Sequence, residues 1–291
     1  MQKIIYDCDN TMGLENREVD DALTILYFLG REDIDLAGIT TTFGNDSIDA
    51  VYGATEVLLR DVNRTDIPLH RGGVPLDRIS PAARFLADAA AANPGEITLV
   101  ATGALTNLYG ASMLEPRFFS LLKRVVLMGG ITGPLVINGV DCKELNLSCD
   151  PEASLHVLTS PAHTTVINGH ICLQAVFGGD EFRRLDLERG IPLFSYLQAR
   201  LCPWRDLMKK VFKIEGFFNW DMVAGVYVTD PELFDENFVK VVSSVEDMKS
   251  GLIRTADCAD GGPFINMPLR ISDIKRFNDL VFNAWARVGL N

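Results

Sequence analysis

The sequence predicts an α/β protein with an open, mostly parallel (Rossmann-like) sheet and helices on both faces. In the first half of the chain, short apolar runs alternate with amphipathic segments. Two of the runs, Ile97–Val100 and Val125–Met128, are apolar except for Thr98, which is typical of strands that are buried on both faces. Strand–helix alternation of this kind favours parallel strands whose connecting helices cover the sheet.

The first elements follow one another closely. A short strand is expected at Ile4–Tyr6, and it ends at an acidic loop. A helix is expected at Asp20–Leu29, because its apolar residues share one face, its start is acidic and Gly30 follows it. Leu36–Thr42 is a second β-rich run.

Capping signals mark the helices that come next. Asn45-Asp46-Ser47 supplies N-cap chemistry for a helix that runs to about Arg60. Another helix is expected near Leu105–Ser112, after the first of the two apolar runs. Asp150-Pro151-Glu152 combines a cap, a proline in the first turn and an acid, which indicates a further helix start.

Nothing in the sequence marks a domain boundary. A length of 291 residues is near the upper limit for one domain, and the chain has no repeat, low-complexity tract or Ser/Gly linker. We therefore expect a single domain over residues 1–291. Residues from about 185 to 218 are helical in pattern and rich in aromatic side chains, so they are predicted to form a lid over the sheet edge.

The composition excludes several kinds of partner. With 39 acids against 27 bases, the net charge of −12 repels nucleic acid and anionic lipid. No apolar run approaches the roughly 18 residues that cross a bilayer, and acids come too early for a signal peptide. The six cysteines include no CxxC pair, so we expect free thiols in a reducing cytoplasm and no zinc site.

Polar side chains gather after the apolar runs. In an open α/β sheet, ligands bind beyond the carboxyl ends of the strands. The residues expected at that rim are Asp7, Asp9, Asn10, Asp20, Asp21, Asn45, Thr102, the stretch 138–146 and Asp221. Asp and Asn are also common caps and turn formers, so it is the convergence of several loops that indicates a site.

Such a group of carboxylates indicates a cation. Acids that are brought together raise one another's pKa unless a positive charge neutralises them. Oxygen ligands without Cys or His favour a hard ion, and the number of candidate oxygens suits calcium better than magnesium.

The first loop fits one family by a short pattern. Asp7-Cys8-Asp9-Asn10-Thr11 matches the DxDxT signature of haloacid-dehalogenase-type phosphatases, in which the first Asp is the nucleophile and magnesium lies between the two acids. The distal Lys and the late acidic pair of that family have no convincing counterpart in this chain.

The chain resembles the inosine–uridine nucleoside hydrolase family over roughly residues 4 to 287. That family's DxDPGxDDA segment corresponds to Asp7-Cys8-Asp9, an insert, and Asp20-Asp21-Ala22. The other matching segments, in order, are Ile39–Asn45 (similar to ITTVGGN), Ala101–Leu108 (GPLTN), Met128–Gly130 (MGG), Glu144–Asn146 with Asp150–Ala153 (EFN…DPEA), and Trp220-Asp221 with Asp230–Glu232 (HDPxAVAY…DPE).

The resemblance implies calcium as the cofactor and a role for each matching residue. The implied calcium ligands are Asp9, Asp21, Asp221 and the backbone carbonyl of Thr102. The implied ribose-hydroxyl contacts are Asp20, Asn45, Asn138, Glu144 and Asn146. Asp9 is also implied as the base that takes a proton from calcium-bound water, and Asp7 as the residue that orients the loop.

The implied reaction is hydrolysis of a ribonucleoside to ribose and free base. Its transition state resembles an oxocarbenium ion, so carboxylates and amides around the sugar stabilise the positive charge. The metal positions a water and eases its deprotonation. The departing base must be protonated or otherwise stabilised. The resemblance also implies nucleoside catabolism and a homodimer or homotetramer.

The sequence departs from the family pattern in two places. Asn10-Thr11 replaces Pro-Gly, and ten residues separate Asp9 from Asp20. Trp220 stands where a His is commonly the proposed proton donor; its ring could stack on a base, which favours purines, or could be purely structural. His170, after an apolar run, is then a candidate general acid.

We therefore predict a calcium-dependent N-ribohydrolase with a purine preference. One alternative is a magnesium phosphohydrolase that uses Asp7 as its nucleophile. The other is a non-catalytic nucleoside- or ribose-binding protein, which the complete set of Asp9, Asp21 and Asp221 argues against.

Overall fold

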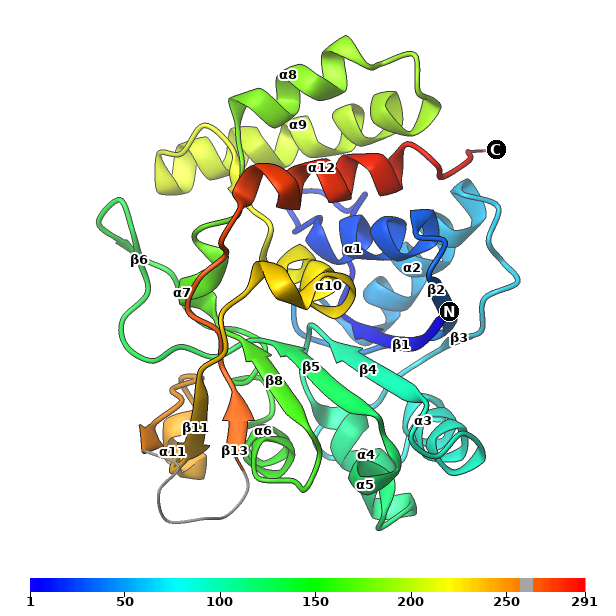
Figure 1. Cartoon of the computed structure of the whole chain (residues 1–291), viewed down its shortest axis with the longest axis vertical. Coiled ribbons are helices and arrows are strands. Elements are labelled where there is room, and N and C mark those ends of the chain that lie inside the picture. Colours follow the sequence, from blue (N-terminus) through cyan, green and yellow to red (C-terminus); the bar gives the residue numbers. More distant parts are fainter. Residues whose placement is uncertain (257–263, 291) are drawn as a thin grey trace.

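The computed structural model describes residues 1–256 and 264–290 of the chain. They form a nine-stranded sheet in the order β12-β11-β13-β8-β5-β4-β1-β2-β3. All neighbours from β13 to β3 are parallel, whereas β11 is antiparallel to both β12 and β13. Helices cover both faces (Figure 1). The predicted fold class is confirmed.

The strands and helices lie close to the predicted ranges. The sheet strands are β1 (Gln2–Cys8), β2 (Ile34–Thr41), β3 (Leu69–His70), β4 (Ile97–Ala101), β5 (Arg124–Met128), β8 (Thr164–Ile167), β11 (Phe238–Val241), β12 (Thr255–Ala256) and β13 (Phe264–Asn266). Two short antiparallel pairs lie outside the main sheet: the hairpin of β6 (Val136–Ile137) with β7 (Val140–Asp141), and β9 (Val176–Phe177) with β10 (Phe217–Phe218).

The helices divide between the two faces of the sheet. One face carries α1 (Asp20–Gly30), α2 (Ile48–Asp61), α7 (Gly169–Cys172), α8 (Gly179–Leu187), α9 (Pro192–Phe212), α10 (Trp220–Thr229) and α12 (Ile274–Trp285). The other carries α3 (Pro81–Ala92), α4 (Thr106–Leu114), α5 (Phe118–Leu121), α6 (Pro151–Leu158) and α11 (Val245–Met248). A 3₁₀ turn, η1 (Pro231–Leu233), follows α10.

The predicted caps form where the sequence places them. The Ser47 hydroxyl accepts a hydrogen bond from the backbone N–H of Ala50 at 3.4 Å, at the start of α2. The Asp150 carboxylate accepts one from the N–H of Ala153 at 3.2 Å, at the start of α6. Each bond satisfies a donor that has no partner within its helix.

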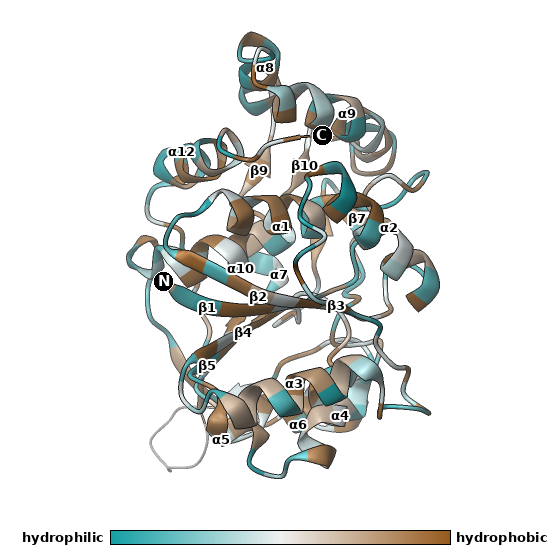
Figure 2. Ribbon diagram, turned by 90° about the vertical axis from the view of Figure 1, so that its right-hand side faces the viewer, coloured by the Kyte–Doolittle hydropathy of each residue, from teal (hydrophilic) through white to brown (hydrophobic). Residues whose placement is uncertain are grey.

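Strand β1 is buried on both faces. Ile4, Tyr6 and Cys8 point into the core between the sheet and the α1/α10/α12 layer. Ile5 points into the core on the α3–α6 side. Figure 2 shows these layers above and below the sheet. Because successive side chains of a strand alternate between faces, a central strand needs apolar residues at consecutive positions.

The chain changes direction within the sheet at β1. It runs from β1 to β2 and β3 on one side, and then returns to place β4 on the other side of β1. Asp7 is paired with Thr40 of β2 and with Ala101 of β4, so the loops that follow all three strands leave from neighbouring positions. Ligands of open α/β sheets bind at such a switch point.

The predicted lid corresponds mainly to α9 and β10. Figure 1 shows α8 and α9 stacked beyond α12, on the side of the sheet that also carries α1 and α10. Trp204, Met208 and Phe212 of α9 face the site region, as described below. Within the described ranges no helix, α9 included, is both long and apolar enough to cross a bilayer.

Helix α12 packs closely on the end of α1. Gly30 leaves no space there, because a Cβ atom on it would lie 1.9 Å from the carbonyl oxygen of Ala284. The indole N–H of the buried Trp285 donates to the carbonyl of Leu23 at 3.0 Å. The close contact between α1 and α12 therefore requires glycine at position 30.

We predict that Gly30→Ala destabilises the protein by about 1–3 kcal/mol, because the added methyl group displaces α12 from α1. The matched control is Gly53→Ala in α2, where a Cβ atom meets nothing within 4 Å. There the substitution is expected to stabilise by about 0.5–1 kcal/mol through helix propensity. Urea unfolding measures both changes, and equal effects at the two glycines would contradict the packing argument.

Candidate active site

Asp7 connects three elements beneath the site. Its carboxylate, at the end of β1, accepts hydrogen bonds from the Thr40 hydroxyl of β2 and from the Asn107 amide of α4 at 2.8 Å. The side chain is fully buried, and its second oxygen has no partner among the described residues. Burial raises the pKa of Asp7 to about 7. These contacts tie the end of β1 to β2 and α4.

Asp9 is held in a confined place just after β1. The backbone N–H of Asn45 donates to it at 2.7 Å, and the Asn45 amide lies 3.4 Å from its other oxygen. Gly44 has a φ of +156°, and a Cβ atom there would lie 2.1 Å from an Asp9 oxygen. A Cβ atom on Gly103 would lie 3.1 Å from the Asp9 carboxyl carbon. The two glycines therefore make room for the carboxylate.

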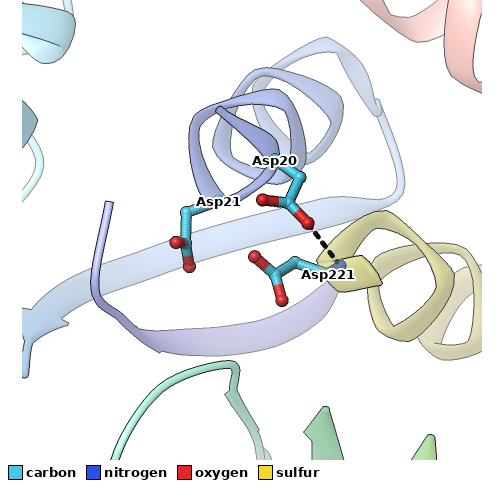
Figure 3. Close-up of side chains that lie close together, drawn as sticks. All are labelled: Asp20, Asp21 and Asp221. Carbon is cyan, nitrogen blue, oxygen red and sulfur yellow. Dashed lines mark hydrogen bonds between the residues drawn. The ribbon is translucent and has the colours of Figure 1, made fainter. Parts of the chain in front are cut away.

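Three more carboxylates meet where two helices begin. Asp20 and Asp21 open α1, Asp221 lies in the first turn of α10, and one oxygen from each lies within 4.8 Å of the others. The Asp221 backbone N–H donates to Asp20 at 3.2 Å (Figure 3). Helix N-termini favour negative charge, so the two converging helices partly stabilise the cluster. Asp21 lies close enough to both Asp9 and Asp221 for the ionisation of the three acids to be linked, which joins Asp9 to the group.

The four acids have strongly perturbed pKa values. Burial first, and then repulsion between neighbouring carboxylates, raise the pKa of Asp9, Asp20 and Asp221 well above the usual range. The pKa of Asp21 is about 6, because burial raises it and hydrogen bonds from Thr102 and others lower it. In the described ranges no Lys or Arg forms an ion pair with any of the four. An all-oxygen cluster of this kind could hold a hard metal ion.

Thr102 and Asn146 complete the wall beside the acids. The Thr102 hydroxyl lies 2.7 Å from an oxygen of Asp21. The Asn146 amide donates to the carbonyl oxygens of Thr102, at 2.9 Å, and Met128, at 3.0 Å. Asn146 thereby orients the Thr102 carbonyl and keeps its own side-chain oxygen available as an acceptor.

Glu144 is held by backbone donors. Its carboxylate accepts from the N–H groups of Leu147 at 2.7 Å, Ser148 at 2.9 Å and Gly130 at 3.1 Å. Gly251 has a φ of +68°, and a Cβ atom on it would lie 2.0 Å from a Glu144 oxygen. Burial raises the pKa of Glu144, although these hydrogen bonds oppose the shift. The residue therefore presents a fixed acceptor at the site.

Two adjoining cavities meet at this rim. The first is here called the acidic cavity, and its polar lining includes Asp20, Asn45, Thr102, Glu144, Asn146 and Asp221. The second, the aromatic cavity, is lined by Trp204, Met208, Phe212, Phe217 and Phe218. Four residues line both cavities: Glu18, Cys142, Lys143 and Trp220. The two cavities therefore adjoin at these four residues.

Comparison with known proteins agrees with this arrangement. Residues 4–262 match the model of the inosine-uridine preferring nucleoside hydrolase family. The chain belongs to this family. Members are hydrolases that act on the N-glycosyl bond of ribonucleosides, and the chain is such an enzyme.

Relatives in the family match nearly the whole chain. The protein is 28% identical to a probable uridine nucleosidase 2 of Arabidopsis thaliana, over 98% of this chain and 90% of that protein. A plant nucleoside hydrolase structure matches with a TM-score of 0.84 at 23% identity, covering 98% of this chain and 99% of that one. A purine-preferring ribonucleoside hydrolase from Gardnerella vaginalis matches with a TM-score of 0.84 at 20% identity, covering 98% of each chain.

Five of the predicted site residues line neither cavity of this nucleoside hydrolase: Asp7, Asp9, Asp21, Asn138 and His170. Of these, Asp21 lies within 4.8 Å of Asp221, which does line the acidic cavity. Asn138, at the tip of the β6–β7 hairpin, is exposed, and its amide donates to the carbonyl oxygens of Phe212 at 3.0 Å and Lys213 at 3.3 Å. Asn138 is predicted from its spacing to Glu144 in the sequence. That spacing does not indicate where the β6–β7 hairpin points, and the hairpin tip lies against the end of α9. His170 lies in α7 and lines neither cavity, and its Nε2 is buried without a described partner.

No individual role is predicted from the sequence for the polar residues shared by the two cavities. Cys142 and Lys143 lie within the stretch 138–146 that is expected at the rim, directly before Glu144. Glu18 lies two residues before Asp20 and is not among the residues expected there. Because each stands outside a motif position, only the folded loops indicate that they line both cavities.

We predict opposite effects of Asp221→Asn with and without metal. In chelator at pH 8, the variant should be more stable than the wild type by about 1 kcal/mol or more, since one of the buried like charges is removed. Saturating Ca²⁺ should raise the wild-type melting temperature by about 5–10 °C, estimated from binding linkage.

Thermal unfolding with and without Ca²⁺ measures both effects. Asp221→Asn should lose most of the rise, whereas Asp88→Asn, an exposed acid on α3, should retain it. An equal rise in all three proteins would show that the ion binds somewhere else.

Proposed function

We propose that the protein hydrolyses ribonucleosides with the ribose in the acidic cavity and the base in the aromatic cavity. The observation that carries the proposal is the direct junction of the two cavities. The first offers carboxylate and amide groups that suit the hydroxyls of a sugar, and the second offers rings that suit a planar base. We also propose that α9 acts as the lid, because three of its side chains line the aromatic cavity.

The metal proposed for the carboxylate cluster is Ca²⁺, with Asp9, Asp21, Asp221 and the Thr102 carbonyl as its ligands. The cluster fits such an ion because it is buried, lacks a paired Lys or Arg among the described residues, and offers only oxygen donors. When bound, the ion supplies positive charge that offsets the carboxylates and makes a nearby water more acidic.

Asp9 is proposed as the general base. The Asn45 N–H fixes one of its oxygens at 2.7 Å, and the other, which has only the longer 3.4 Å contact with the Asn45 amide, accepts a proton from the attacking water. The water oxygen then bonds to the anomeric carbon, the bond to the base nitrogen breaks, and its electron pair leaves with the base. Asp20, Asn45, Glu144 and Asn146 are proposed to hold the ribose hydroxyls, and the nearby carboxylates stabilise positive charge on the ring. Asn138 could join them only if the hairpin moved.

The structure favours this reaction over the phosphohydrolase alternative. A nucleophilic Asp7 would have to turn toward the substrate, but hydrogen bonds from Thr40 and Asn107 hold its buried carboxylate at the end of β1. A non-catalytic nucleoside-binding protein could have the same two cavities, but it would release no ribose in the assay described below.

A purine preference is proposed from Trp220. Its half-buried ring lines both cavities and lies 5.2 Å from the ring of Phe218. The related proteins differ in the base that their names give, one being a uridine nucleosidase and another purine-preferring. We propose a role in purine salvage or nucleoside catabolism as a homodimer or homotetramer. A cytoplasmic location is proposed because the five described cysteines are free; Cys258 lies outside the described residues.

We predict ribose release from inosine or uridine that requires a divalent cation, and no phosphate release from p-nitrophenyl phosphate. Asp9→Asn should lower kcat by about 10²–10⁴-fold, since the general base is lost. Asp88→Asn is the control for the loss of an exposed carboxylate. A reducing-sugar assay with metal and with chelator measures release. Full ribose release by Asp9→Asn would exclude the proposed base, and phosphate release without ribose would exclude the proposed reaction.

We predict that Trp220→Ala lowers kcat/KM for inosine about tenfold more than for uridine, because the larger base loses more stacking. Trp220→Phe should retain most of the preference. The measurement is steady-state kinetics at saturating Ca²⁺, so that a changed metal affinity at the neighbouring Asp221 does not contribute. Equal losses on both substrates would contradict a role in base selection.

A further inference from the structure

The proposed reaction leaves the departing base without an obvious partner. When the glycosidic bond breaks, the electron pair moves onto the base, so positive charge or a proton must be supplied there. Trp220 stands where the family commonly has a histidine, and its indole is a poor proton donor. His170 lines neither cavity.

One basic side chain lies at the place where the base meets the sugar. Lys143 follows β7 and lines both the acidic and the aromatic cavity. Among the described residues that line the two cavities, it alone is basic. Its exposed side chain forms no ion pair with a described carboxylate, whereas Lys209 and Lys249 are paired with Glu215 and Glu246 at 2.6 Å.

The other ionisable residues at the junction suit the task less well. Burial raises the pKa of Cys142 to about 11, so it remains a thiol, which is a weak hydrogen-bond donor. Burial raises the pKa of Glu18 to about 7, so a large share of this side chain is an anion at neutral pH, and an anion would repel a base that gains negative charge. A lysine ammonium offers three donors on a flexible stem that can follow a leaving group.

Resting on the proposed function, we propose that Lys143 is a catalytic residue that stabilises the departing base. As the bond from the anomeric carbon to the base nitrogen breaks, the ammonium donates a hydrogen bond to a ring nitrogen. The proton that the base finally carries comes from Nζ, which regains one from solvent. The proton lost by the attacking water goes to Asp9, so the reaction is balanced.

The test compares two substrates that differ in leaving group. Inosine releases a base that needs stabilisation, whereas 4-nitrophenyl β-D-ribofuranoside releases a phenolate that is stable as an anion. Lys143→Met, which keeps the length but removes the charge, should lower kcat on inosine about 10²-fold and change the nitrophenyl rate little. Lys143→Arg keeps the positive charge and the hydrogen-bond donors but does not release a proton, so it should recover only part of the inosine rate.

A second lysine serves as the control for the loss of a positive charge. Lys249→Met removes a nearby exposed lysine that lines neither cavity, and it should leave both rates unchanged. Equal losses on the two substrates in Lys143→Met, or no loss, would overturn the proposal. So would a selective loss on inosine in Glu18→Gln with none in Lys143→Met. If the wild type cleaves neither substrate, the proposed function itself fails.

Discussion

The site depends on keeping several carboxylates buried close together. Such a group is costly to bury because like charges repel and water is excluded from them. The fold offsets part of this cost by directing the N-termini of α1 and α10 at the cluster. Hydrogen bonds from Thr102 and from the Asn45 backbone support Asp21 and Asp9. The remaining excess of negative charge is what makes the place suited to a cation.

The need to hold buried carboxylates close together explains several residues that have no proposed role in the reaction itself. Gly44 and Gly103 provide the space that Asp9 occupies, and Gly251 provides the space beside Glu144. Asp7 lines neither cavity but joins β1 to β2 and α4 through its hydrogen bonds. Rigid support of this kind holds acidic side chains in positions that they would otherwise leave because they repel one another.

The two ends of the site are built from different parts of the chain. The acidic cavity uses loops at the carboxyl ends of central strands, whose positions are set by the sheet. The aromatic cavity uses α9 and the short strand β10, which lie outside the main sheet. If the base lies in the aromatic cavity as proposed, a change in base preference can arise in α9 and β10 without a change in the acidic cavity, because the two cavities are built mainly from separate segments.

The sequence alone determined the sheet class, the starts of α1, α2 and α6, and the grouping of Asp20, Asp21 and Asp221. These follow from local periodicity, from capping chemistry and from the rule that parallel strands end at one edge. Only the tertiary structure decided that Asn138 faces the end of α9 and that Lys143 lies between the two cavities. Loop directions depend on contacts between residues far apart in the chain, which local patterns do not encode.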